Sequence, residues 1–396
     1  MRILSYYVLF TLESDGLTDY KEFVKGEHVK NGVAALEKKN VRSLAVLGKF
    51  GNSVSSTSRH ILSEYAKQKK WKSHLCRFID IPDTVEENTI LFVYGWFGFL
   101  NDDLCSTGTV QTACHRLEQM LNNTRSVKVI VGMRSDLRTR YDKYLEEFTN
   151  LLLHKAIHLD SENANKDVEY LNFFEENIKN PCEDGECECK HLTYDMLQDG
   201  KDKNVGIPLI LNVIARYHDL VPNYRKDRDI LKALSDHFTA LGENNDMKFV
   251  YEWIIYICLK GKFSRLDLFD EKTVIDVGLQ IRKDTFNEND VHMQKYIRMR
   301  YSDQHNNVSA EEAQYVFWHP FIYICAFHSL FKKDRDLIMT HCNIDAILQL
   351  VRPTGFKTSY IEISADDHAV NMFNSRLREH NLVEKYKGHP LVVSTT

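Results

Sequence analysis

The sequence predicts an α/β domain built on a parallel sheet, followed by mostly helical regions. In the first 160 residues, short apolar runs alternate with segments of helical periodicity. Strands that are apolar throughout are typical of a parallel sheet that helices cover on both faces. Beyond residue 204 the strongest patterns are helical. With 43% hydrophobic and 27% charged residues, the chain has the composition of a globular protein.

The elements of the first domain follow one another in a regular order. Residues 29–36 are expected to form a helix, because Val29, Val33 and Leu36 fall on one face. Apolar runs predict strands at 44–47, 75–79, 89–94 and 127–131. Helical spacing predicts further helices around 61–66, 110–121 and 141–148, and a last apolar run covers 156–159.

Changes of composition along the chain predict its domain organisation. Residues 1–20 are expected to be an N-terminal extension, and residues 21–165 the α/β domain. Residues 166–204 are acidic and contain cysteines, which favours a linker with at least one helix. Residues 205–261 carry apolar helical patterns and predict a helical domain. Residues 262–396 mix helices with short extended runs such as 358–363.

The turn after the first predicted strand is the expected ligand site, because ligands bind beyond the carboxyl ends of parallel strands. A phosphate-binding loop has the pattern G-x-x-x-x-G-K-[ST], in which backbone N–H groups and the lysine hold phosphates and the hydroxyl binds Mg²⁺. The turn fits in length, but it lacks the lysine, and an ordinary tight turn is the alternative interpretation. In order, the aligned residues are Gly48, Gly51, Ser53 at the second glycine, Val54 at the lysine, Ser55 at the hydroxyl, and Ser56.

The other strand ends lack part of the same chemistry. A strand that anchors Mg²⁺ in such a site ends in an acidic residue, whereas the strand at 89–94 runs into Tyr94-Gly95-Trp96. Asp102 and Asp103 follow too far along the loop to be taken as substitutes. Arg134 follows the strand at 127–131, where a sensor of a γ-phosphate would lie, and a surface ion pair is the alternative.

Several segments occur in an order that is found in a known group of proteins. They are 23–36, 44–48, the strand with Gly98, 129–134, Gly206-Ile207-Pro208-Leu209 and Phe317-Trp318-His319. In this order the chain resembles the STAND-type signalling ATPases, most closely the group called novel STAND NTPase 3, over residues 20–396. The resemblance implies a P-loop NTPase-like sheet domain followed by helical and winged-helix-like domains that close over a nucleotide.

The resemblance also implies roles for two further residues. Pro208 matches a proline that packs near the adenine. His319 matches a winged-helix histidine that senses the bound diphosphate, although Pro320 follows it where many relatives carry an acidic residue. The apolar residues on both sides of His319 favour core packing as the alternative role.

The departures from the motif pattern decide the expected function. Phosphoryl transfer depends on positioning and electrostatic stabilisation, so without the lysine and the carboxylate we expect no catalysis. The prediction is a pseudo-ATPase that acts as a signalling or regulatory module through association with other proteins or with itself. We expect no cofactor, or weakly bound ATP or ADP, with Mg²⁺ only if ATP binds. The alternatives are an ATP/ADP-binding switch with slow or no hydrolysis, and an enzyme of another class that reuses the cleft.

A group of cysteines in the acidic segment forms a candidate metal site. Cys182, Cys187, Cys189 and His191 have the spacing C-x4-C-x-C-x-H. Thiolates and imidazoles are the ligands of structural zinc, although this spacing is tighter than that of the common zinc motifs. Zinc is therefore one hypothesis, and a set of thiols on an exposed loop is the other.

Charge and hydropathy narrow the expected partners. The net charge of −5 lacks the basic excess of a nucleic-acid-binding protein, so we expect no nucleic-acid partner. No run approaches the roughly 20 apolar residues of a membrane-spanning helix, so we expect no membrane association. Nine cysteines are an odd number spread over a long chain, which favours a reducing compartment and predicts a cytoplasmic protein.

Overall fold

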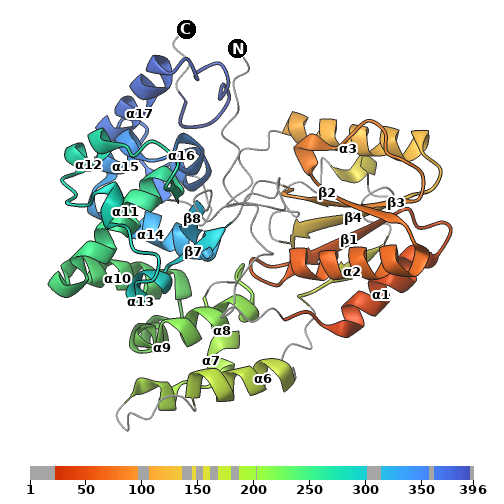
Figure 1. Cartoon of the computed structure of the whole chain (residues 1–396), viewed down its shortest axis with the longest axis horizontal. Coiled ribbons are helices and arrows are strands. Elements are labelled where there is room, and N and C mark those ends of the chain that lie inside the picture. The colour runs from red at the N-terminus through yellow and green to blue at the C-terminus, as the bar shows by residue number, and fades with distance from the viewer. Residues whose placement is uncertain are drawn as a thin grey trace. The chain divides into compact units, whose positions relative to one another are not determined.

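The computed structural model describes residues 23–96, 107–135, 145–148, 155–160, 168–179, 187–201, 203–300, 314–355 and 361–392. The described residues divide into two compact units, one within residues 23–230 and the other within residues 231–392 (Figure 1). The N-terminal extension expected at residues 1–20 lies outside the described residues, as do Gly98, Asp102, Asp103 and Cys182. The domain boundaries expected at 204/205 and 261/262 stay predictions.

The first unit is an α/β domain around a five-stranded parallel sheet, which confirms the predicted fold class for this region. The strand order is β2-β3-β4-β1-β5, and each strand pairs in parallel with its neighbours. The strands are β1 (Ser43–Gly48), β2 (Lys72–Arg77), β3 (Thr89–Tyr94), β4 (Val127–Arg134) and β5 (Ala156–His158). β2 begins earlier than the apolar run predicted at 75–79, because its first residues are exposed at the sheet edge and carry no apolar signal.

Helices cover both faces of this sheet (Figure 1). α1 (Gly26–Glu37) and α2 (Val54–Lys69) pack on one face, and α3 (Thr107–Asn123) packs on the other. Successive side chains of a strand point to opposite faces. Leu44 and Val46 of β1 therefore pack with α1 and α2, whereas Ala45 and Leu47 pack with α3. Burial on both faces explains why the inner strands are apolar throughout.

The rest of the first unit is helical. Its elements are α6 (Val168–Phe174), the π-helical turn η5 (Glu175–Lys179), η6 (Glu188–His191), α7 (Tyr194–Gln198), α8 (Ile207–Arg216), η7 (His218–Leu220) and α9 (Val221–Asp227). The segment expected to be a linker, 166–204, thus contains short helices with buried apolar side chains such as Tyr170, Phe174 and Leu197. Phe23 packs edge-on against Tyr170 with the ring centroids 4.9 Å apart.

The second unit combines helices with two small sheets. Its helices are α10 (Ile230–Glu243), α11 (Lys248–Lys260), α12 (Glu271–Val277), α13 (Val291–Gln294), α14 (Pro320–Lys333), α15 (Arg335–His341), α16 (Ile344–Leu350) and α17 (His368–Glu379). β6 (Phe263–Ser264), β8 (Gln314–Phe317) and β7 (Ile297–Arg300) form an antiparallel sheet in that order, and β9 (Val351–Pro353) pairs in parallel with β10 (Ile361–Ile363). α10 and α11 lie within residues 205–261, where the apolar patterns predict helices, whereas the winged-helix-like assignment of 262–396 stays a prediction. In the part of the chain that the structure describes, no helix combines the length and the apolar character needed to cross a membrane.

The strand order has a topological switch point between β1 and β4. β1 leads through α2 to β2 at one side of the sheet, whereas β4 leads to β5 at the other side. Ligands of doubly wound sheets bind where the connections of two adjacent strands diverge in this way. Gly48 at the end of β1 is in register with Arg134 at the end of β4. The turn between β1 and α2 therefore lies at the edge where a ligand is expected.

Candidate functional site

The turn between β1 and α2 has the backbone of a turn that usually requires glycine. Gly51 has a φ of 82°, and Ser53 lies in the left-handed region with φ 54° and ψ 34°. Left-handed backbone is uncommon for residues other than glycine. Ser53 stands where a phosphate-binding loop carries its second glycine, so the chain keeps the conformation at this position without the residue that adopts it most easily.

Val54, at the position of the lysine, is part of the packing at the sheet edge. A Cβ added to Gly48 would lie 2.9 Å from Val54 Cγ2, and one added to Gly132 would lie 3.2 Å from Val54 Cγ1. The valine also packs against the apolar cluster between α1, α2 and the sheet. The side chain that replaces the lysine therefore fills space between β1, β4 and α2.

The carboxylate of Asp160 accepts hydrogen bonds from the turn between β1 and α2. Asp160 follows β5, and its Oδ1 accepts hydrogen bonds from the backbone N–H of Lys49 at 2.7 Å and from Asn52 Nδ2 at 2.6 Å. Its Oδ2 accepts a hydrogen bond from Ser135 Oγ at 2.5 Å, just beyond the end of β4. One half-buried acidic side chain thus joins the ends of β1, β4 and β5 and places a negative charge where a phosphate would be expected.

Further backbone groups of the turn are also bonded within the protein. Phe50 N donates to Asn204 O at 3.0 Å, and Asn52 N donates to Lys49 O at 3.0 Å. The N–H groups in the first turn of α2 are different, because the side chain of Ser53 gives them no capping hydrogen bond. Ser55 is half-buried there and Ser56 is buried. The start of the turn is therefore satisfied internally, while the beginning of the helix keeps its donors.

The segment before α8 packs directly on this turn. Gly206 N donates to Phe50 O at 2.8 Å, and a Cβ on Gly206 would overlap the side-chain amide of Asn52. A Cβ on Gly51 would come within 2.8 Å of Leu209 Cδ2. Pro208 lies between Gly206 and Leu209 in the sequence and is buried in the first turn of α8. The structure thus brings the glycine–x–proline segment to the turn, and its role toward an adenine stays a prediction.

The ends of β4 and β3 carry a cation and aromatic rings. Arg134 lies over the ring of Phe50, with Cζ 4.6 Å from the ring centroid, so the guanidinium stacks on the turn. Tyr94 ends β3 with its ring 5.9 Å from that of Phe92, and Trp96 is buried against Phe78. Arg134 lies at the carboxyl end of β4, and its role as a phosphate sensor stays a prediction.

His319 lies in the second unit, where it caps a helix. Its Nδ1 accepts a hydrogen bond from Phe321 N at 3.1 Å at the start of α14. The side chain is buried, and burial together with the nearby Arg298 lowers its pKa to about 3. These observations agree with core packing, the alternative that the flanking apolar residues favoured.

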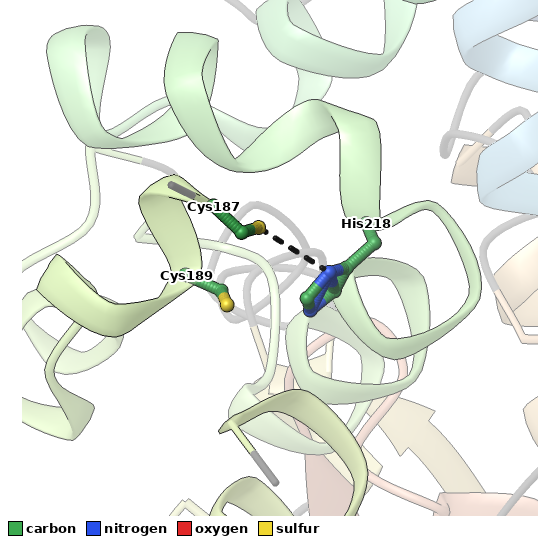
Figure 2. A group of neighbouring side chains, drawn as sticks. All are labelled: Cys187, Cys189 and His218. Carbon is green, nitrogen blue, oxygen red and sulfur yellow. Dashed lines mark hydrogen bonds between the residues drawn. The ribbon is translucent and has the colours of Figure 1, made fainter. Parts of the chain in front are cut away.

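The predicted metal ligands are only partly brought together. Cys187 and Cys189 approach each other and a histidine, but this histidine is His218 rather than His191 (Figure 2). His191 is exposed at the end of η6 and is not a member of the group. The short helical turn η6 explains the difference, because it buries Cys189 while leaving His191 on the solvent side.

A polar cavity in the second unit has no counterpart among the predicted sites. It has a volume of about 590 Å³ and is bounded by α11, α12, α15 and α17. Lys260 donates to Asp270 Oδ2 at 2.6 Å at its wall. Although burial raises the pKa of Asp270, hydrogen bonds from Lys260 and Thr273 lower it to about 2. Its lining residues come from four helices without a common motif, so no sequence pattern indicates it.

Asp160 and His218 are the two residues near these sites that sequence patterns missed. A signal for Asp160 existed, since it follows the last strand of a parallel sheet and the ends of parallel strands meet at one edge. His218 had no local signal. His218 lies 29 positions after Cys189 in the sequence, and only the fold brings the two residues together.

Comparisons with known proteins give similarities to solved structures alone. No family model matches the chain, and no curated protein matches it. Among solved structures, the chain is similar to one in the structure of Drosophila ORC bound to DNA. The two are 11% identical, the similarity covers 78% of this chain and 88% of that chain, and the TM-score is 0.32. Similarity at this level carries no argument about function, and the resemblance to STAND proteins stays a prediction.

This finding corrects one expectation drawn from composition. The expectation of no nucleic-acid partner is withdrawn: it rests on the net charge of the whole chain, and the similar chain is part of a structure described as bound to DNA. The physical reason is that a net charge of −5 sums over all 396 residues, whereas nucleic acids are bound by local basic surface.

Proposed function

We propose that the first unit is a P-loop-like domain that has lost ATP hydrolysis and serves as a non-catalytic regulatory module. The carboxylate of Asp160 on the N–H of Lys49 is the observation that carries the proposal. A bound triphosphate would bring like charge to this carboxylate. Two unit charges 4 Å apart repel by about 4 kcal/mol at the effective dielectric near a protein surface.

Two missing groups support the same conclusion. Val54 supplies apolar packing where a lysine would neutralise the phosphates. Tyr94 ends β3 where a carboxylate would anchor Mg²⁺. Because the transfer of a phosphoryl group depends on these charges, their loss removes both the stabilisation of the transition state and the metal.

A nucleotide-binding switch without hydrolysis is the second candidate function. It is supported by the start of α2, whose first N–H groups have no side-chain cap. The hydroxyl of Ser53 is buried and has no hydrogen-bond partner among the described residues. Helix N-termini of this kind hold phosphate groups. This function requires the phosphate to bind beside Asp160 rather than in its place.

Calorimetry on the full chain distinguishes the two functions. We expect the wild type to show no Mg²⁺-dependent binding of ATP or ADP. The double variant Val54→Lys with Asp160→Asn supplies the cation and removes the carboxylate charge while keeping an oxygen that accepts from Lys49 N. It should therefore gain binding of Mg²⁺–ATP by roughly tenfold or more, the effect of about 1.4 kcal/mol.

A matched control removes the same charge elsewhere in the same unit. Asp195→Asn changes an exposed residue of α7 and should leave nucleotide binding unchanged when it is combined with Val54→Lys. Tight Mg²⁺-dependent ATP binding by the wild type would establish the switch instead. Turnover of ATP by the wild type would refute both functions.

A further inference from the structure

Two cysteines and a histidine from different segments meet in the first unit. Cys187 directly precedes η6, Cys189 lies within it, and His218 begins η7. One ligand atom of each lies within 4.8 Å of the other two, and Cys187 Sγ is 3.9 Å from His218 Nδ1. Figure 2 shows the two sulfur atoms and the imidazole ring turned toward a common point.

These separations are close to those of a tetrahedral zinc site. With Zn–S near 2.3 Å and Zn–N near 2.0–2.1 Å, two ligand atoms of a tetrahedron are roughly 3.6–3.8 Å apart. The distance of 3.9 Å between Cys187 Sγ and His218 Nδ1 is close to this value. Side-chain rotations that move each ligand atom by about 1 Å or less would bring all three atoms to bonding distance of one ion.

The histidine is held in the form that binds a metal. His218 Nε2 lies 2.8 Å from the carbonyl oxygen of Ile178 in η5. A carbonyl only accepts, so Nε2 carries the proton and Nδ1 presents its lone pair toward the sulfurs. Metal-binding histidines are oriented in this way by a carbonyl or carboxylate on the other ring nitrogen.

We propose that Cys187, Cys189 and His218 bind one Zn²⁺. The two thiols lose their protons on binding, and the two thiolates balance the charge of the ion. Cys189 is buried, whereas Cys187 and His218 are half-buried, and these three residues leave the fourth position of the tetrahedron to a further ligand or to water. The ion connects η6 with η7 and, through His218 and Ile178, with η5. Zinc binding therefore stabilises this helical part of the first unit.

Metal counting on the full chain tests the site. The protein is stripped with a chelator under reducing conditions and reloaded with Zn²⁺, and the ion is counted by mass spectrometry and its affinity measured by chelator competition. We expect one Zn²⁺ per chain and a rise in melting temperature on loading. His218→Ala and Cys189→Ser should each weaken binding by roughly tenfold or more.

His191→Ala is the matched control, because it removes the histidine that the sequence pattern indicated and the structure places outside the group. It should bind zinc like the wild type. His218→Cys should restore binding lost in His218→Ala and add a thiolate charge-transfer band to the spectrum of the Co²⁺ form. Cys187→Ser serves as a second ligand variant at a half-buried position that tolerates substitution if Cys189→Ser fails to fold.

Three results would overturn the site. One is a wild type that retains no zinc after loading. Another is equal loss of affinity in His191→Ala and His218→Ala. The third is the loss of two hydrogen atoms in reducing buffer, located by peptide mass mapping to Cys187 and Cys189, which would show that these two residues form a disulfide instead.

Discussion

At the scale of single residues, Gly206 allows the segment before α8 to touch the turn after β1. A Cβ at this position would lie 2.5 Å from Asn52 Cγ and would overlap its amide oxygen. Asn52 is itself held by Asp160, so it cannot move without loss of that hydrogen bond. We expect Gly206→Ala to lower the free energy of unfolding of the first unit by about 1–3 kcal/mol, measured by urea denaturation.

Gly26→Ala is the control for this substitution. A Cβ on Gly26, the first residue of α1, meets no atom within 4 Å. Alanine there also restricts the unfolded chain, so the variant should be neutral or more stable by up to about 1 kcal/mol. Equal destabilisation by both variants would show that the contact between Gly206 and Asn52 is not what requires glycine.

The same residues show which parts of the site follow from sequence. The positions of Val54 and Arg134 at the sheet edge could be predicted, because they are fixed by local strand and helix patterns. Asp160 could not be connected to Lys49 without the order of the strands, since 111 positions separate them. The replacement of His191 by His218 has the same origin, because the fold rather than spacing decides which histidine faces the thiols.

At the scale of elements, Asp270 holds the start of α12. Its Oδ1 accepts from Thr273 N at 2.9 Å, and its Oδ2 accepts from Thr273 Oγ1 at 2.8 Å and from Lys260 Nζ at 2.6 Å. Removal of an N-cap side chain costs about 1 kcal/mol. We expect Asp270→Ala to lower the stability of the second unit by about 1–2 kcal/mol in urea denaturation.

Asp270→Asn separates the cap from the ion pair with Lys260. Asparagine caps a helix as well as aspartate does, and an ion pair between half-exposed groups contributes only about 0–1 kcal/mol. The asparagine variant should therefore retain most of the stability. If it were as unstable as the alanine variant, the ion pair and not the cap would hold this end of α12.

The buried strand β3 was predicted more accurately from the sequence than the exposed strand β2. β3 occupies the residues of the apolar run at 89–94, because both of its faces are covered. β2 was displaced, because an edge strand exposes its side chains and loses the apolar pattern. The short helices within 168–198 were also indistinct in the sequence, since each spans only one or two turns and buries few residues.

At the scale of the whole molecule, acid acts on the second unit through histidines with lowered pKa values, among them His319, which is buried, and His389, which is half-buried. Burial, with the nearby Arg298, lowers the pKa of His319 to about 3, and burial with the nearby Arg352 lowers that of His389 to about 4. Each Nδ1 accepts a backbone N–H, from Phe321 at 3.1 Å and from Leu391 at 3.2 Å, which a protonated nitrogen cannot do. Unfolding exposes both rings, whose pKa then returns to about 6.5.

The sign of the effect follows from the protons bound in each state. Between pH 6.5 and the lowered pKa values the unfolded chain binds more protons than the folded chain. The stability that the neutral histidines contribute is therefore fully present above about pH 6.5 and is lost as the pH falls. Well below pH 6.5, each histidine lowers the free energy of unfolding by about 1.4 kcal/mol for each pH unit, until the pH reaches the pKa of that histidine in the folded chain. His319 and His389 together should therefore contribute about 2.7 kcal/mol per pH unit near pH 5, in addition to the contribution of His341, whose pKa is also lowered by burial.

Tryptophan fluorescence can report this loss in the second unit alone. Trp71→Phe with Trp96→Phe leaves Trp253 and Trp318, which are both buried in that unit. Urea denaturation of this variant at several pH values between 7.5 and 4.5 should show the falling stability. His319→Asn keeps an acceptor for Phe321 N but does not titrate, so it should reduce the slope by about 1.4 kcal/mol per pH unit. A slope that is unchanged in His319→Asn would mean that His319 is already protonated in the folded chain, and its buried neutral state would be wrong.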